Sequence, residues 1–242
     1  MTSLSVNLNA VAMLRNRRDV GWPSVINIAK IVLQAGADGI TVHPRPDERH
    51  IRKSDVYDLS ELLKDYPQKE LNIEGYPTSD FLALVSEIKP QQVTFVPDDP
   101  AQATSDHGWD IDANVELLKN SIAKMQALNI RTSLFIDEDP KMPPKANIVG
   151  ADRVELYTGP YGAKFMLPEG DFHLDRLSIT ARAANAAGLK INAGHDLTLE
   201  NLPAFIKAVP NIDEVSIGHG ITSDALFVGF AEAVRRYKAV LE

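Results

Sequence analysis

The sequence contains no cysteine in its 242 residues, so it offers neither a disulfide nor a thiolate site. This absence fits a reducing compartment, and we expect a cytoplasmic protein. No stretch approaches the roughly 20 consecutive apolar residues that cross a bilayer. The first residues, MTSLSVNLNA, also lack the basic segment and long apolar run of a signal peptide. The sequence therefore predicts neither export nor membrane insertion.

An excess of positive charge is missing as well. The chain has 25 lysine and arginine residues against 33 aspartate and glutamate residues, which gives a formal net charge of −8. This balance argues against nucleic acid or a membrane surface as a partner, although it is compatible with a local phosphate pocket. The GxGxxG and GxxxxGKS/T fingerprints are also absent, so we expect neither a dinucleotide nor a nucleoside triphosphate.

The chain instead repeats one pattern: a short β-branched run, a polar or glycine-bearing loop, and a stretch with helical spacing. The eight runs cover residues 4–11, 39–45, 71–76, 92–98, 131–138, 153–159, 190–196 and 214–220. Several are too apolar for half-exposed antiparallel strands, which indicates a buried parallel sheet. With no low-complexity linker, the alternation predicts a single (β/α)8 TIM barrel domain over residues 1–242. A doubly wound open sheet is the alternative.

Helix boundaries have local signals of their own. Ser54, Thr78 and Ser223 are candidate caps at helix starts, because their hydroxyl groups can accept a hydrogen bond from the first turn. Two similar phrases, AGADGITV and VGADRVEL, predict helix-to-strand turns in which Gly36 and Gly150 end the preceding helices.

Titratable side chains lie where the predicted strands end. Active sites of (β/α)8 barrels form at the C-terminal ends of the strands. There the sequence places His43, Arg45, Glu74, Asp98, Asp137, Glu155, His195 and His219. Taken singly, each has a structural alternative: His219 could cap a backbone carbonyl, and Glu155 and Asp137 could form ion pairs inside the barrel mouth. Their convergence on one rim favours a catalytic site.

The chemistry of this set points to proton transfer on a phosphorylated small molecule. Histidine titrates near neutral pH, and a glutamate shielded from water can be raised toward it. The loops at 194–201 and 218–225 offer backbone amides at helix N-termini, and the arginines offer bidentate anion partners at positions 15, 17, 18, 45 and 49. No strand ends in lysine, which disfavours a Schiff-base aldolase.

Seven motifs carry a family resemblance along the whole chain. They are VNLNAVAMLRNRR (6–18), AGADGITVHPRPDERHI (35–51), LNIEG (71–75), TSLFID (132–137), VELYTGPYG (154–162), LKINAGHDLT (189–198) and SIGHGI (216–221). In this order they resemble the pyridoxine 5'-phosphate synthase family of vitamin B6 biosynthesis.

The resemblance implies condensation of 3-amino-2-oxopropyl phosphate with 1-deoxy-D-xylulose 5-phosphate to pyridoxine 5'-phosphate, phosphate and water, with no cofactor and no metal. It implies that His43 is a proton acceptor, Glu74 a second acid/base group, His195 a proton donor and Glu155 a group supporting the transition state. The implied substrate-binding residues are Asn7, Arg18, Arg45, His50, Thr104, Gly218 and His219. It also implies additional short helices and a homo-octamer.

Two departures from the family pattern fall within the expected substrate site. Asn9 and Ala10 stand where the family commonly has Asp-His, facing the deoxyxylulose phosphate, and Asp196 stands where many members have glycine, near a substrate phosphate. We therefore add Asn9 and Asp196 to the expected substrate-binding residues. The polar segment 98–110 is expected to close over bound substrate.

Two rival functions stay open at this point. One is a metal-dependent barrel isomerase or hydrolase, against which the lack of an HxH pair on the first strand weighs. The other is a catalytically silent relative that only binds a phosphorylated ligand.

Overall fold

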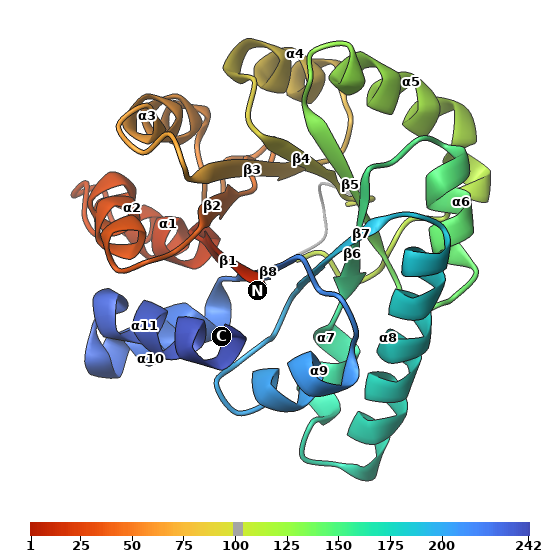
Figure 1. Cartoon of the computed structure of the whole chain (residues 1–242). Coiled ribbons are helices and arrows are strands. Elements are labelled where there is room, and N and C mark those ends of the chain that lie inside the picture. The colour runs from red at the N-terminus through yellow and green to blue at the C-terminus, as the bar shows by residue number, and fades with distance from the viewer. Residues whose placement is uncertain (99–103) are drawn as a thin grey trace.

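Eight parallel strands close into a barrel in the computed structural model, which describes residues 1–98 and 104–242 (Figure 1). The strands are β1 (Ser3–Asn7), β2 (Gly39–Val42), β3 (Glu70–Gly75), β4 (Gln92–Phe95), β5 (Arg131–Ile136), β6 (Arg153–Tyr157), β7 (Lys190–Gly194) and β8 (Glu214–Ile217). Each pairs with its neighbour in sequence, and β1 also pairs with β8. The predicted (β/α)8 barrel is confirmed, and this closure excludes the open sheet.

A ring of helices surrounds the strands (Figure 1). These helices are α1 (Asn9–Asn16), α2 (Val25–Gln34), α3 (Lys53–Leu63), α4 (Ser79–Ile88), α5 (Val115–Gln126), α6 (Met142–Ile148), α7 (Gly159–Lys164), α8 (Pro168–Ala186), α9 (Leu202–Ala208), α10 (His219–Val228) and α11 (Phe230–Leu241). A 3-10 turn at Asp112–Asn114 precedes α5. Helices α1 and α7 each share a connection between two strands with a second helix, and α10 precedes α11 after β8, so the expected additional short helices are present. Among the described residues, no helix combines the length and apolarity needed to cross a membrane.

The predicted helix boundaries are partly confirmed. Thr78 caps α4 by accepting a 3.1 Å hydrogen bond from the Phe81 amide, and Gly36 and Gly150 end α2 and α6 with φ of +113° and +94°.

Several boundary predictions were wrong, including the ends of the runs 153–159 and 214–220, which extend into α7 and α10. Ser54 lies inside α3, because the Asp55 carboxylate already accepts the Arg52 amide at 2.8 Å. Ser223 lies inside α10, which begins directly after β8. The run at 4–11 was too long, since the Asn7 side chain accepts the Asn9 amide at 2.9 Å and α1 starts there.

The interior of the barrel is polar, which the sequence analysis did not predict. TIM barrels ordinarily fill this space with branched apolar side chains. Here Thr94 on β4 donates to Glu155 on β6 (3.4 Å), and Gln92 on β4 donates to Glu214 on β8 (3.4 Å), linking strands that are not neighbours. The alternate positions of each strand, such as Leu4, face the helices and join the apolar core. The apolar core is therefore a shell between sheet and helices, around a polar centre.

Candidate active site

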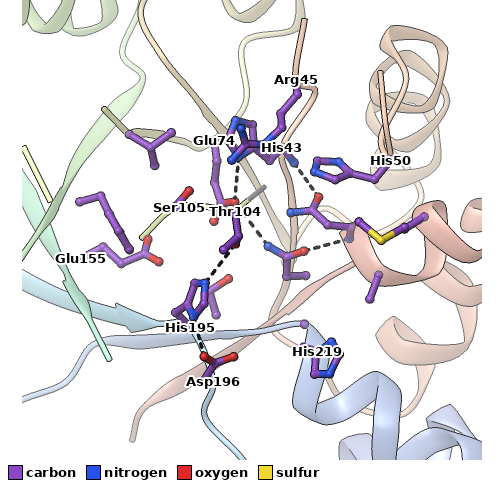
Figure 2. A pocket seen from close by; sticks show the side chains of 18 residues that line it. His43, Arg45, His50, Glu74, Thr104, Ser105, Glu155, His195, Asp196 and His219 are labelled. Atoms are coloured by element: carbon purple, nitrogen blue, oxygen red, sulfur yellow. Dashed lines mark hydrogen bonds and ion pairs between the residues drawn. The ribbon is translucent and has the colours of Figure 1, made fainter. Parts of the chain in front are cut away.

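A cavity of about 480 Å³ opens at the C-terminal end of the barrel (Figure 2). Its lining includes every expected site residue except Arg18: His43, Glu74, Glu155, His195, Asn7, Asn9, Arg45, His50, Thr104, Asp196, Gly218 and His219. Arg18 lies exposed after the end of α1 and does not line this cavity. Eight strand ends far apart in sequence thus contribute to one site.

His43 follows β2 and is buried at the cavity wall. Its backbone amide donates to the Asn9 side chain at 2.9 Å. Its Nδ1 lies 3.9 Å from Glu74 Oε2 and 4.0 Å from Asp98 Oδ2. Burial, followed by the charge of Arg45, lowers the pKa of His43 well below its usual value. The imidazole is therefore neutral at neutral pH and available as a base.

Glu74 lies near the end of β3 beside this imidazole. The Asn7 side chain donates to its Oε2 at 3.4 Å. Burial and the nearby Asp98 carboxylate raise the pKa of Glu74 to about 7. A carboxyl group with such a pKa can both take and return a proton near neutral pH.

Glu155 lies deeper, on β6, with only 3% of the residue exposed. The Thr94 hydroxyl donates to it at 3.4 Å, and Gly194 opposite leaves room for it: a Cβ there would lie 2.4 Å from Glu155 Oε1. Burial, then the charges of Glu74 and Glu214, raise the pKa of Glu155 well above its usual value. These surroundings thus favour the neutral form of Glu155, which lines the cavity.

The alternative that Glu155 and Asp137 form ion pairs in the barrel mouth was wrong. Asp137 accepts a hydrogen bond from the Gly108 amide at 2.8 Å and does not line the cavity. Within the described ranges, neither carboxylate lies in an ion pair.

His195 follows β7 on the opposite side of the cavity (Figure 2). Its Nε2 lies 3.1 Å from the Thr104 hydroxyl, and its Nδ1 lies 3.0 Å from Asp196 Oδ2. The Tyr157 and His195 rings pack in a T-shaped arrangement, with 5.2 Å between ring centroids. The contact with His195 holds the pKa of Asp196 below its usual value, so this carboxylate is ionised beside the histidine.

His50 is held in one tautomer. Its Nδ1 accepts the Ile51 amide at 2.9 Å, so the ring proton is on Nε2. Burial and the charges of Arg45 and Arg49 lower the pKa of His50 to about 4. The ring is therefore a neutral hydrogen-bond donor, 6.0 Å from the His43 ring.

Of the arginines expected near the mouth, only Arg45 lines the cavity, where it pairs with Asp98. Arg15 was expected to face the mouth, but α1 directs it into the protein. There its guanidinium donates to Asp55 (2.5 and 2.9 Å) and to the His50 carbonyl (3.0 Å). It therefore ties α1 to α3 and the loop before it.

Gly218 and His219 bring the start of α10 to the cavity. A Cβ at Gly218 would lie 3.1 Å from the Asn7 side chain, so glycine permits the close approach of β1. In the described part of the chain His219 donates to no backbone carbonyl, which removes the main support for a capping role. Among the described residues no side chain caps the first turn of α10, so its backbone amides can serve an acceptor in the cavity.

Several lining residues were missed. Ser105 lines the cavity and donates a 2.7 Å hydrogen bond to Asp98, which lies behind the lining. The sequence analysis placed Asp98 among the strand-end residues, but not among the expected catalytic or binding residues. Ser105, Met13 and Phe135 carry no such signal. The expectation that 98–110 closes over substrate includes residues 99–103, which lie outside the described residues.

No metal-binding cluster is present in the described ranges 1–98 and 104–242. No three histidine, aspartate or glutamate side chains there are arranged to hold an ion. The acidic and basic groups of the cavity instead contact one another or neutral donors.

Comparisons with known proteins agree with the resemblance. The family model described as "Pyridoxal phosphate biosynthesis protein PdxJ" matches residues 4–242. A pyridoxine 5'-phosphate synthase of Mesorhizobium japonicum is 58% identical over 236 residues, covering 97% of this chain and 96% of its own. One of Brucella anthropi is 57% identical over 240 residues, covering 98% of each chain.

More distant solved structures share the barrel alone. Phosphoribosyl anthranilate isomerase of Thermus thermophilus is 14% identical with a TM-score of 0.63, covering 99% of this chain and 98% of its own. Thiamine phosphate pyrophosphorylase of Pyrococcus furiosus is 11% identical with a TM-score of 0.61, covering 99% and 94%. Because the family model and the near relatives extend over almost the whole chain, this chain belongs to the PdxJ family of pyridoxal phosphate biosynthesis proteins.

Proposed function

We propose that this protein is a pyridoxine 5'-phosphate synthase. It condenses 3-amino-2-oxopropyl phosphate with 1-deoxy-D-xylulose 5-phosphate and releases pyridoxine 5'-phosphate, inorganic phosphate and water. The observation that carries the proposal is that four proton-transfer groups surround one cavity, in a chain 57% identical over 240 residues to a relative of that name. The class of reaction is a group transfer that forms a ring.

The reaction begins when a carbon–nitrogen bond forms between the amine of one substrate and the ketone of the other. Loss of water, loss of phosphate and closure of the ring each move protons at carbon, nitrogen or oxygen. A single acid or base cannot serve all of these positions. A set of groups on opposite walls of one cavity can, and each contributes about 10²–10⁴ in rate when positioned.

The protonation states support distinct roles. Neutral His43, beside Glu74, accepts a proton, and Glu74 exchanges protons because its pKa is about 7. His195, whose Nδ1 lies 3.0 Å from the Asp196 carboxylate, donates a proton from the opposite side. Glu155 stays neutral and donates a hydrogen bond to charge that develops in the transition state.

Substrate binding uses the remaining lining residues. Arg45 and the first turn of α10, with Gly218 and His219, present positive charge and amide donors to phosphate. His50, Asn7, Asn9 and Thr104 offer neutral hydrogen-bond partners for substrate hydroxyl groups. Arg18 is exposed in this protomer, and we retain it as a binding residue on the resemblance alone. Asp196 lies near a substrate phosphate in this proposal and acts on it by holding His195, whose Nδ1 lies 3.0 Å from the Asp196 carboxylate.

The same family supports proposals for the whole protein: one domain, a cytoplasmic location and assembly into a homo-octamer. Sedimentation velocity of the purified protein tests the assembly, because eight copies of a 26.6 kDa chain sediment far ahead of a dimer.

The function is tested by incubating the purified protein with each substrate alone and with both together. We expect pyridoxine 5'-phosphate and phosphate only in the mixture. Conversion of one phosphorylated substrate alone would favour an isomerase or hydrolase instead. Binding of both substrates with no product, under conditions in which the protein is folded, would favour a silent relative.

A further inference from the structure

The backbone that carries His195 has an unusual conformation. Its φ is +85°, and that of Asp196 is +55°. Side chains other than glycine seldom occupy this left-handed region, because the Cβ crowds the backbone. Two such residues in succession persist only when surrounding contacts hold them. The question is therefore which contacts do so.

Thr158 supplies the central contacts from the end of β6. Its hydroxyl oxygen lies 2.7 Å from the Gly194 carbonyl and 2.5 Å from the His195 carbonyl, which share its single proton, and its amide donates to the Gly194 carbonyl as well (3.0 Å). The residue is fully buried and does not line the cavity. Its hydroxyl can therefore contact these carbonyls but not a substrate in the cavity.

Two further residues hold the next peptide. The Asn201 side chain donates to the Asp196 carbonyl at 2.9 Å. Gly162 leaves space for the same carbonyl, because a Cβ there would lie 2.7 Å from it. With Thr158 they form what we name the His195 clamp: Thr158, Gly162 and Asn201.

The clamp sets the direction of the imidazole. With the backbone held, Nε2 of His195 lies 3.1 Å from the Thr104 hydroxyl, and Nδ1 lies 3.0 Å from Asp196 Oδ2. Rotation of the His195 peptide toward an ordinary φ would move both ring nitrogens away from these partners. A proton donor misplaced by an ångström loses much of its effect.

We propose that Thr158 is a positioning residue for catalysis, whose hydroxyl holds the His195 backbone so that the imidazole faces the cavity. The inference rests on the proposed function, because it takes His195 to be the proton donor. Thr158 itself touches no substrate and acts only through His195.

Thr158→Val tests this, since valine keeps the shape and removes the hydroxyl. We expect kcat to fall by about 10- to 100-fold with KM changed by less than about threefold, because a positioned acid contributes about 10²–10⁴. Thr158→Ser should keep kcat within about threefold of the original. Thr180→Val is the matched control, because Thr180 is also fully buried and donates to a backbone carbonyl, that of Arg176, at 2.9 Å within α8.

Measuring Thr158→Val in a protein that also carries His195→Ala distinguishes positioning of His195 from a merely structural role of Thr158. If Thr158 acts through His195, adding Thr158→Val there should change the residual rate by less than about twofold. An equal loss in both backgrounds would overturn the proposal, as would normal turnover in Thr158→Val or failure of serine to rescue. Should Thr158→Val lack a cooperative melting transition, Thr158→Ala replaces it throughout, because alanine removes the hydroxyl without adding volume.

A readout without substrate separates this inference from the proposed function. In NMR spectra of ¹³C-labelled histidine, the His195 ring signal is identified by its loss in His195→Ala. Thr158→Val should shift or broaden that signal, while Thr158→Ser and Thr180→Val leave it in place. An unmoved signal in Thr158→Val would refute the clamp. If the original protein makes no product but the signal moves as expected, the clamp holds and the proposed function fails.

Discussion

Glu74 and Glu155 line the cavity and Asp98 lies directly behind it, and their surroundings make these three carboxyl groups chemically different. Asp98 pairs with Arg45, whereas the donor to Glu155 within residues 1–98 and 104–242 is the Thr94 hydroxyl. Glu74 lies between these extremes, with the pKa raised to about 7 by burial and by the charge of Asp98. This graded set allows a carboxylate, an exchanging acid and a neutral acid to coexist at neutral pH.

Replacing Glu74 by glutamine keeps the shape of the side chain and removes its titratable carboxyl group. We expect kcat to fall by about 10² or more, because a positioned acid/base group contributes about 10²–10⁴. The melting temperature should stay close to the original. Steady-state kinetics with both substrates measures the effect.

Glu61→Gln is the control, because its side chain is 73% exposed on α3, away from the cavity. Near-normal turnover in Glu74→Gln, or an equal loss in Glu61→Gln, would remove Glu74 from the mechanism.

The site residues were predictable from the sequence to the extent that strand ends are predictable. His43, His195 and Glu155 lie at or near the ends of β-branched runs, and the barrel brings such ends together. The direction of the Arg15 side chain could not be predicted, because its partner Asp55 lies 40 positions further along the chain. Thr158 shows the same, since its hydroxyl acts on carbonyls 36 and 37 positions away.

At the scale of elements, α1 begins at Asn9 and Ala10, where the family resemblance implies Asp-His. Asn9 is the first residue of this helix, and its side chain accepts a hydrogen bond from the His43 amide at 2.9 Å. Asn9 therefore positions a proposed base as well as lining the cavity. Ala10 lines the cavity beside it. Aspartate at position 9 can accept the same amide, so the substitution is compatible with the fold.

Asn9→Asp combined with Ala10→His should restore hydrogen bonds to the deoxyxylulose phosphate. We expect its KM to fall by about fivefold, since a neutral hydrogen bond contributes about 0.5–1.5 kcal/mol. The KM for 3-amino-2-oxopropyl phosphate should change less. Kinetics with each substrate varied in turn measures both constants.

The single change Ala10→Ser is a useful comparison, because it adds a polar group without imidazole. Loss of all activity in the double variant would show a pocket adapted to asparagine and alanine, and would favour a different second substrate.

At the same scale, the order and kind of the strands were predictable and several boundaries were not. Hydrophobic runs and glycine turns identify β1 to β8, but the end of β1 depends on the Asn7 side chain turning back to the Asn9 amide. The start of α3 depends on Asp55 rather than on Ser54. The boundary of an element depends on which of several nearby side chains accepts a hydrogen bond from the backbone amide there. The spacing of residues in the sequence does not show which side chain does so.

The whole molecule is an apolar shell around a polar barrel centre. The sequence signal for this polar centre was the alternation of polar and apolar residues within strands such as SLSVN and RVELY. The sequence analysis considered only the apolar residues of these runs. Glu214 on β8 illustrates the cost of a polar centre. It is 5% exposed, its donors are Gln92 (3.4 Å) and Asn192 (3.3 Å), and burial raises its pKa to about 7.

This burial makes stability depend on pH. Between the ordinary glutamate pKa and about 7, folded Glu214 keeps a proton that the unfolded chain has lost, so its contribution to stability falls as pH rises through this window. Glu214→Gln has no proton to lose. Relative to the original, we expect it to gain about 2 kcal/mol in the free energy of unfolding between pH 5 and pH 8.

Urea unfolding at the two pH values measures this gain, with Glu61→Gln as the exposed control. A difference between Glu214→Gln and the original that does not change with pH would show that Glu214 is ionised in the folded protein throughout.

The proposed chemistry requires proton transfer and anion binding, which the described cavity residues can supply. We therefore expect turnover to survive exhaustive chelation followed by gel filtration into metal-free buffer. Activity measured before and after, with elemental analysis of the same sample, checks this. Loss of activity that returns on adding one divalent metal would show that a metal takes part.

The central claim is that this cavity joins two phosphorylated substrates into one ring, whose nitrogen comes from a substrate and not from the protein. The most direct measurement supplies ¹⁵N-labelled 3-amino-2-oxopropyl phosphate with unlabelled 1-deoxy-D-xylulose 5-phosphate and examines the product by mass spectrometry and NMR. The account predicts pyridoxine 5'-phosphate with ¹⁵N in the ring and an equal amount of inorganic phosphate. Folded protein that forms no ring product, or forms one without the label, would contradict it.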